Sequence, residues 1–192
     1  MVSVRMENVA RANRLASPGD MIRSLALILI PLVIITLLFT DLPDDRPVTE
    51  VEWRPVLATA RRDAPFPVLA PTNLPEGWRA TQAEWVEVGE PSLDGQPSVR
   101  NLWQLGFLNS DDVFIGLDQG DLQADDLVDD QTRAGTADGE SVVGGQFWQR
   151  LLSPDGRTRS LVRRDATVTS VVSGDLPYAA LEAYAATLST SG

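Results

Sequence analysis

The chain opens with a polar segment and continues into a long run of apolar residues. Residues 1–20 show no hydrophobic periodicity, whereas residues 21–40 are apolar with few exceptions. Such a run approaches the roughly 17–25 residues that span a bilayer as a helix. Arg23 lies near the start of the run, where its side chain can reach the head groups, and membrane helices tolerate a proline such as Pro31. The pattern predicts a transmembrane anchor over residues 21–40.

Two alternatives to an uncleaved anchor are a buried helix of a soluble domain and a cleaved signal peptide. A buried soluble helix is not normally flanked by an Arg-rich tail on one side and by Asp41, Asp44 and Asp45 on the other. The residues after the run contain no Ala-x-Ala cleavage site. A lipoprotein is excluded because the chain has no cysteine to acylate. These observations favour an anchor that is retained.

Arginine placement predicts the orientation of this anchor. Arg5, Arg11 and Arg14 precede the apolar run and Arg23 lies near its start, whereas Arg46 is the only basic residue soon after it. Positively charged flanks stay on the cytoplasmic side. Residues 1–20 are therefore predicted to form a cytoplasmic Arg-rich tail, and the larger part of the chain is predicted to lie outside the plasma membrane. Beyond residue 40 the chain has 12 arginines against 25 acidic residues, a net charge of −13.

The rest of the chain alternates between strand and helix patterns. Residues 41–47 contain two prolines and three acids, which is typical of a stiff linker. Within residues 48–192, apolar alternation and turn residues predict strands over residues 48–53, 78–88, 100–109, 111–119, 141–143, 146–152, 158–163 and 167–173. Helical spacing and helix-start residues predict helices over residues 55–63, 121–132 and 176–189. Asp121 is the predicted N-cap of the second helix. The predicted fold is α+β, with a mostly antiparallel sheet and helices on one face.

Composition removes most catalytic chemistry. The chain has no histidine and no cysteine, and all 16 basic residues are arginines. This excludes the usual general base, thiolate chemistry, common zinc sites, Schiff bases and the Walker lysine. No Gly-x-Ser-x-Gly elbow is present. The formal net charge of −11 also argues against nucleic acid as a partner. We assign no catalytic, cofactor-binding or metal-binding residue, and we expect no cofactor.

Carboxylate side chains could still bind a metal ion or catalyse hydrolysis, so two hypotheses stay open. Calcium could bind an acidic cluster, but the cluster lacks EF-hand spacing, so a solvated face is the simpler interpretation. Its members are Asp111, Asp112, Asp118, Asp121, Asp125, Asp126, Asp129 and Asp130. Glycoside hydrolysis needs two acids across a cleft, and no motif identifies such a pair among Glu84, Glu87, Glu90 and Glu140.

Five tryptophans and one loop are the candidate recognition elements. Trp85 and Trp103 share strand faces with apolar residues, which favours a place in the core, whereas the face of Trp148 is ambiguous. The loop Leu74, Pro75, Glu76, Gly77 and Trp78 is the candidate binding surface, because loops on rigid scaffolds often carry function. Turn chemistry favours a simpler alternative, in which the prolines and glycine shape a turn and the tryptophan fills the core.

Several segments occur together in a recognisable order. They are Trp53-Arg54-Pro55, Pro65-Phe66-Pro67-Val68-Leu69-Ala70-Pro71, Leu74-Pro75-Glu76-Gly77-Trp78-Arg79, Trp103-x-Leu105-Gly106-Phe107 and Trp148-Gln149-Arg150. In this order they resemble a family of single-anchor actinobacterial proteins, domain of unknown function 4245. The resemblance covers nearly the whole chain. It implies a membrane-anchored outer domain and supplies no activity and no catalytic residues.

Three functional hypotheses follow. The first is a binding or interaction module of the cell envelope with a protein partner, which predicts an exposed apolar patch. The second is a domain that binds a small lipid or glycan, which needs an apolar cavity of roughly 300 Å³ or more. The third is a carboxylate-based envelope hydrolase, which needs two acids about 5–9.5 Å apart. Nothing in the sequence specifies the oligomeric state.

Overall fold

A computed structural model describes residues 22, 25–31, 49–91 and 95–191. The chain divides into two compact units, Met1–Pro47 and Val48–Gly192. In the first unit residues 25–31 are helical, and apolar side chains such as Leu27 and Ile28 are exposed. Within the described ranges, no helix combines the length and the apolar character needed to cross a bilayer. The tail, the linker and most of residues 21–40 lie outside the described residues, so the anchor stays a prediction.

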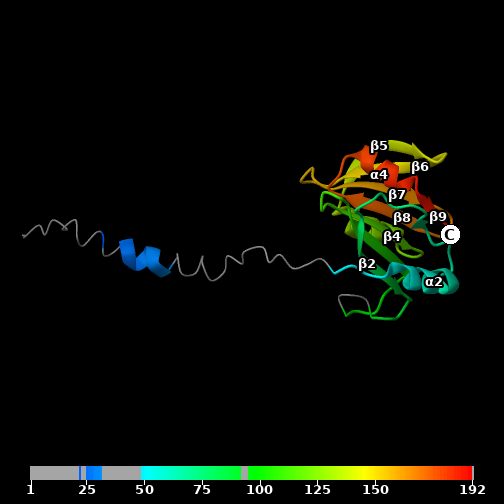
Figure 1. The fold of residues 1–192 in the computed structure, drawn as a ribbon, viewed down its shortest axis with the longest axis horizontal. Coiled ribbons are helices and arrows are strands. Elements are labelled where there is room, and N and C mark those ends of the chain that lie inside the picture. The colour runs from blue at the N-terminus through cyan, green and yellow to red at the C-terminus, as the bar shows by residue number, and fades with distance from the viewer. Residues whose placement is uncertain (1–21, 23–24, 32–48, 92–94, 192) are drawn as a thin grey trace, which may run out of the picture. The chain divides into compact units, whose positions relative to one another are not determined.

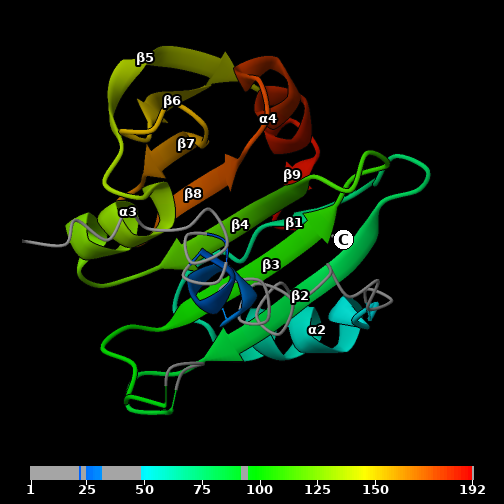
Figure 2. The same ribbon diagram turned by 90° about the vertical axis from the view of Figure 1, so that its left-hand side faces the viewer.

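The second unit is built on an antiparallel sheet of seven strands in the order β2-β3-β4-β8-β7-β6-β5 (Figures 1 and 2). The strands are β2 (Arg79–Val86), β3 (Leu102–Leu108), β4 (Phe114–Gly120), β5 (Thr136–Val143), β6 (Gln146–Leu152), β7 (Arg159–Arg164) and β8 (Thr169–Gly174). Two meanders, β2–β4 and β5–β8, join where β4 pairs with β8. The predicted antiparallel sheet is confirmed, and its two edges are β2 and β5.

Helices cover both faces of this sheet. The remaining elements are α2 (Trp53–Asp63), α3 (Ala124–Thr132), α4 (Tyr178–Ala185) and a two-stranded ribbon of β1 (Ala70–Pro71) with β9 (Leu188–Ser189). Helices α2 and α4 pack on one face, and α3 packs on the other through Val128, which contacts Val162 and Val171. The prediction that helices cover one face is wrong. Val171 and Val172 alternate across β8 and both are fully buried, so each face of this strand needs a cover.

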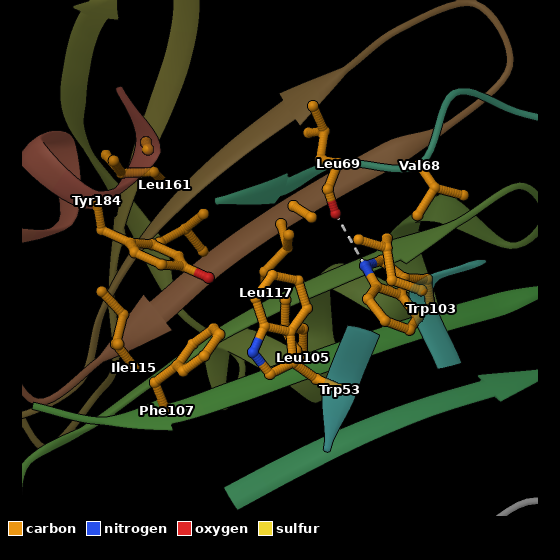
Figure 3. Close-up of a cluster of buried hydrophobic side chains, with 14 of the residues drawn as sticks. Trp53, Val68, Leu69, Trp103, Leu105, Phe107, Ile115, Leu117, Leu161 and Tyr184 are labelled. Atoms are coloured by element: carbon orange, nitrogen blue, oxygen red, sulfur yellow. Dashed lines mark hydrogen bonds between the residues drawn. The ribbon is translucent and has the colours of Figure 1, made fainter. Parts of the chain in front are cut away.

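The main core lies between the sheet and the layer formed by α2 and α4. Alternate residues of β3, namely Trp103, Leu105 and Phe107, point into it as predicted. Trp53 of α2 and Tyr184 of α4 meet Phe107 with ring centroids 5.9 and 6.2 Å apart (Figure 3). The core placement predicted for Trp85 and Trp103 is confirmed, since Trp103 is buried and Trp85 packs half-buried against the main core. Trp53 and Trp148 are also buried, and Trp78 is half-buried against the same cluster.

The segment before β1 is fixed by buried hydrogen bonds to the sheet. The indole Nε1 of Trp103 donates to the carbonyl of Leu69 at 3.0 Å (Figure 3). The side chain of Gln119 accepts from the Leu69 amide at 2.7 Å and donates to Ser170 Oγ at 3.1 Å. Because these polar groups are buried, each bond also prevents the cost of an unpaired group. The segment thus closes one side of the core although it forms almost no regular structure.

Three predicted elements differ from the structure. Residues 49–52 form no strand, although the Val51 amide donates to the carbonyl of Ala80, and α2 begins at Trp53. Asp121 is not the N-cap of α3, because its carboxylate accepts hydrogen bonds from Asn101 and α3 starts later. The last helix ends at Ala185 rather than at residue 189, since the following residues pair with β1 to form the ribbon.

Replacing Tyr184 by Phe should raise the free energy of unfolding by up to about 1 kcal/mol. Tyr184 is buried, its hydroxyl has no hydrogen-bond partner among the described residues, and burial holds the pKa of the phenol above its usual value. The substitution removes the unpaired polar group and keeps the ring contacts with Trp78 and Phe107. Urea unfolding of the full-length protein measures the change. Tyr184→Leu is the control and should destabilise, and a clear loss with Phe would contradict the prediction.

Candidate functional site

The predicted loop Leu74–Trp78 is a turn whose last residue enters the core. The Trp78 amide donates to the carbonyl of Pro75 at 3.3 Å, and Gly77 adopts a φ of +81°, which favours glycine. The Trp78 ring stacks on Tyr184 with 5.7 Å between centroids and an interplanar angle of 18°. Pro75, Glu76 and Gly77 remain exposed. Trp78 thus has a structural role, and binding by the exposed part of the turn stays a prediction.

Two hollows meet at Leu74. The larger, of about 630 Å³, runs along α2, and we call it the α2 hollow. Its lining residues are Trp53, Arg54, Leu57, Ala58, Arg61, Ala70, Pro71, Thr72, Asn73, Leu74 and Ser191. The smaller, of about 390 Å³, lies at the start of α2 and shares Trp53, Arg54 and Leu74 with the larger one. The α2 hollow exceeds the roughly 300 Å³ that the small-ligand hypothesis requires.

The hairpin of β5 and β6 exposes an apolar pair. Val142 and Phe147 lie opposite each other across the two strands, and they are 64% and 72% exposed. The turn between the strands is Gly144-Gly145, and both glycines have positive φ, as a tight two-residue hairpin turn requires. Their neighbours Val143 and Trp148 point to the other face and are buried. This pair is a candidate for the exposed apolar patch that the interaction hypothesis predicts.

This pair lies at an open edge of the sheet. β5 is the last strand in the sheet order and has β6 as its only strand neighbour in the described sheet. An edge strand presents unpaired backbone N–H and C=O groups on its outer side. A hollow of about 680 Å³ adjoins Phe147, with Glu140, Gln149 and Arg164 among its lining residues. We call Val142, Phe147 and β5 the edge surface. The turn signal at Gly144-Gly145 predicts the hairpin, and the alternation of Phe147 with Gln149 could have indicated that Phe147 is exposed.

Glu84 and Glu140 do not form a catalytic pair. Glu84 lies in β2 and Glu140 in β5, at the two ends of the strand order. With about 4.8 Å between neighbouring strands, six strand steps separate these residues by about 25–30 Å. A glycosidase pair requires about 5–9.5 Å. The geometry therefore removes this pair from the hydrolase hypothesis.

Among the described residues of the domain, Asp118 is the buried carboxyl. It lies in β4 on the face opposite the main core, and Gln104 Nε2 donates to its Oδ1 at 2.8 Å. Burial raises the pKa of Asp118 from its usual 3.8 to about 6. Glu84 of β2 lies on the same face of the sheet, opposite Gln104 of β3. Burial also raises the pKa of the Glu84 carboxyl. Asp118 is only 6% exposed, so it is closed to a substrate and we assign it no catalytic role.

The other acidic residues are dispersed over the domain. Asp112 pairs with Arg79, and Asp125 pairs with Arg164 at 2.8 Å. Asp121 instead binds Asn101. Within the part of the chain that the structure describes, no three acidic, histidine or cysteine side chains are grouped to hold a metal ion. The described residues of this cluster are thus not grouped as a calcium site, and Asp112, Asp118, Asp121 and Asp125 bind side chains elsewhere in the domain.

Arg150, Ser141 and Glu182 form a polar cluster that no sequence pattern predicts, because its members lie in three different elements. Arg150 donates through Nη2 to Glu182 Oε1 and through Nε to Ser141 Oγ, both at 2.6 Å, and Ser141 Oγ donates to the same carboxylate. Hydrogen bonds from Ser141 and Arg150 hold the pKa of Glu182 below its usual range. A carboxylate held ionised in this way is a poor base for a serine nucleophile. The cluster instead fastens α4 to β5 and β6.

A family model described as "Protein of unknown function (DUF4245)" matches residues 14–188. The chain belongs to the DUF4245 family. The match covers the whole described part of the α+β domain except its last residues, and it also covers the predicted anchor. The description of the DUF4245 family assigns no activity to its members. No curated protein matches the chain in sequence.

Solved structures give the DUF4245 domain only a distant likeness. One is the Pseudomonas aeruginosa complex of MucA and MucB, at 16% identity and a TM-score of 0.35, covering 63% of this chain and 34% of that chain. Another is MucB in complex with MucA(peri), at 15% identity and a TM-score of 0.36, covering 63% of this chain and 35% of that chain. The aligned part spans about a third of those chains, and a likeness at this level assigns neither a fold nor a partner.

Proposed function

We propose that this DUF4245 protein is a membrane-anchored binding module of the cell envelope. In this proposal residues 21–40 span the plasma membrane once, the N-terminus is cytoplasmic, and the α+β domain outside binds a protein partner. The exposed pair of Val142 and Phe147 beside the open edge of β5 carries the proposal. The lack of an assembled catalytic group among the described residues supports binding over catalysis.

The edge surface suits an extended segment of a partner protein. Such a segment can add a strand to β5, with backbone hydrogen bonds supplying affinity and side-chain contacts supplying specificity. Val142 and Glu140 lie on the same face of β5, two residues apart, and both are exposed. Charge and polarity complementarity therefore favour a partner strand with an apolar residue opposite Val142 and a basic residue two positions away. The apolar residue would also cover Phe147.

Replacing Phe147 by Glu should lower partner recovery from native membranes at least about tenfold. Recovery is measured by crosslinking the full-length protein and quantifying the stoichiometric partner after purification. The side chain of Phe147 is 72% exposed, so the variant should keep its stability within about 0.5 kcal/mol. Leu122→Glu is the matched control, since Leu122 is 51% exposed outside the edge surface, and it should leave recovery unchanged.

A photocrosslinking amino acid in place of Gln149 identifies the segment that binds. Gln149 is exposed on the same face as Phe147. The crosslinked peptide should contain an apolar and a basic residue two positions apart. If Phe147→Glu recovers as much partner as the unchanged protein, the edge surface is not the partner site. The same holds if a photocrosslinking residue on α3 crosslinks the partner as often as one at position 149.

A further inference from the structure

We infer that the α2 hollow binds an anionic amphiphile, an acyl chain that carries a carboxylate or phosphate head group. This site is separate from the edge surface and goes beyond the proposed function. It is formed by one side of α2 and by residues 70–74, which face each other across the hollow. The inference rests on the charges, the free hydrogen-bonding groups and the apolar side chains that line it.

Two arginines lie along the helix side of the hollow. Arg54 and Arg61 are seven residues apart in α2, so they share one side of the helix about 10 Å apart. The guanidinium of Arg54 lies over the Trp53 ring, 5.1 Å from its centroid. Arg61 donates through Nη2 to the carbonyl of Ser189 at 3.3 Å, which holds its side chain at the other end of the hollow. The hollow thus has a fixed cation at one end and an exposed cation at the other.

These two cations have no carboxylate partner among the described residues, although the domain is strongly acidic. Beyond residue 40 the net charge is −13, yet no Asp or Glu lines the α2 hollow, and Glu50 and Glu52 line only the smaller hollow beside it. By contrast, the adjacent Arg62 pairs with Asp63 at 2.7 Å. Arginine binds carboxylate and phosphate through two parallel hydrogen bonds, which makes it the preferred residue for such head groups. An acid-free basic hollow in an acidic domain therefore selects an anion.

The apolar lining indicates what the anion carries. Trp53, Leu57 and Leu74 line the hollow between the arginines, and such a surface suits hydrocarbon rather than a small hydrated ion. The Asn73 side chain at its rim makes no hydrogen bond among the described residues, so its amide is free for an ester or hydroxyl of the ligand. A head group on arginine and a chain on the apolar wall together define an amphiphile.

The predicted anchor keeps this hollow near a supply of such ligands. Twelve residues lie between residue 40 and the start of α2 at Trp53. Even fully extended, they span at most about 45 Å. If the anchor of the proposed function holds, both phospholipids and fatty acids released from them lie within reach. The affinity of the hollow itself does not depend on the anchor.

Brominated lipids test the site because bromine quenches tryptophan fluorescence on contact and Trp53 lines the hollow. The probes are dibromostearate, a brominated phosphatidate and, as a neutral reference, a brominated monoacylglycerol. Each is titrated into the full-length protein in phosphatidylcholine nanodiscs. We expect saturable quenching by at least one anionic probe and at least about tenfold weaker binding in Arg54→Glu and in Arg61→Glu. Arg62→Glu is the matched control on the same helix and should bind as the unchanged protein does.

The outcomes separate the ligand source from the site. Quenching by dibromostearate alone indicates a free fatty acid, and quenching by the phosphatidate alone indicates a membrane phospholipid; both support the site. Arg54 is exposed, so its variant keeps the inference testable even if Arg61→Glu unfolds. Equal quenching by the neutral probe, no saturation, or quenching unchanged by Arg54→Glu would overturn it. Phe147→Glu should leave the quenching intact, so this test and that of the proposed function fail independently.

Discussion

Replacing Asp118 by Asn should stabilise the folded protein at pH 8 by about 2–3 kcal/mol and change its stability little at pH 4. Burial raises the pKa of this carboxyl from 3.8 to about 6, and Gln104 is its hydrogen-bond donor. A carboxyl whose pKa is raised by folding stabilises the folded state while it is protonated. That contribution is complete below about pH 3.8 and is lost as the pH rises through about 6. Asparagine keeps the neutral form at every pH.

Urea unfolding of both proteins between pH 4 and pH 8 measures this difference. Other carboxyls, such as those of Asp155 and Glu182, have a lowered pKa in the folded state and change stability in the opposite direction. The difference in the free energy of unfolding between the variant and the unchanged protein gives the contribution of Asp118 alone. This difference should widen from pH 4 to pH 7. Glu84→Gln is the control and should give a smaller gap, because this carboxyl is only half-buried. A gap that stays constant with pH would show that the Asp118 carboxyl titrates normally.

Replacing Trp103 by Ala should lower the free energy of unfolding by about 4 kcal/mol. The side chain is fully buried at the centre of the main core, and its Nε1 donates to the carbonyl of Leu69 (Figure 3). The substitution leaves a cavity and a buried carbonyl without its partner. A loss of this size is a large part of the roughly 5–15 kcal/mol that stabilises a typical domain.

The Phe variants separate the hydrogen bond from the cavity. Trp103→Phe should cost more than Trp85→Phe, because the Nε1 of Trp85 has no hydrogen-bond partner among the described residues and Trp85 is half-buried. The difference should be at least about 1 kcal/mol. Chemical unfolding of the full-length protein gives both values. Equal costs would mean that the bond to Leu69 contributes little to stability.

The sequence was sufficient to predict the strands and their faces in the first meander. Alternation placed Trp103, Leu105 and Phe107 on one face, and turn residues placed the bends, because both depend on neighbours in the chain. The pairing of Leu117 with Val172 could not be predicted in this way, since alternation specifies a face and not a neighbouring strand. The consecutive buried residues Val171 and Val172 could have indicated a strand covered on both faces.

The candidate sites depend on contacts that a sequence pattern does not contain. The seven-residue spacing of Arg54 and Arg61 is visible in the sequence, but the facing wall of residues 70–74 exists only after the chain folds back. Asp118 follows the buried Leu117, so alternation places it on the opposite face, where a carboxylate normally meets water. Asp118 lies between Gln104 and Val171 of the neighbouring strands, and no local pattern specifies these neighbours.

The pairing of β4 with β8 has a consequence for folding kinetics. Each meander is built from strands adjacent in the chain, whereas the seam between them joins residues such as Ile115 and Gly174 across a long loop. The entropy of closing that loop must be overcome before the seam contacts contribute, so docking of the two meanders is expected to limit the folding rate. The α2 hollow adjoins the first meander and the edge surface lies in the second. Because side chains of both meanders, such as Phe107 and Leu161, share the main core, the docked domain is expected to unfold as one cooperative unit that holds the α2 hollow and the edge surface together.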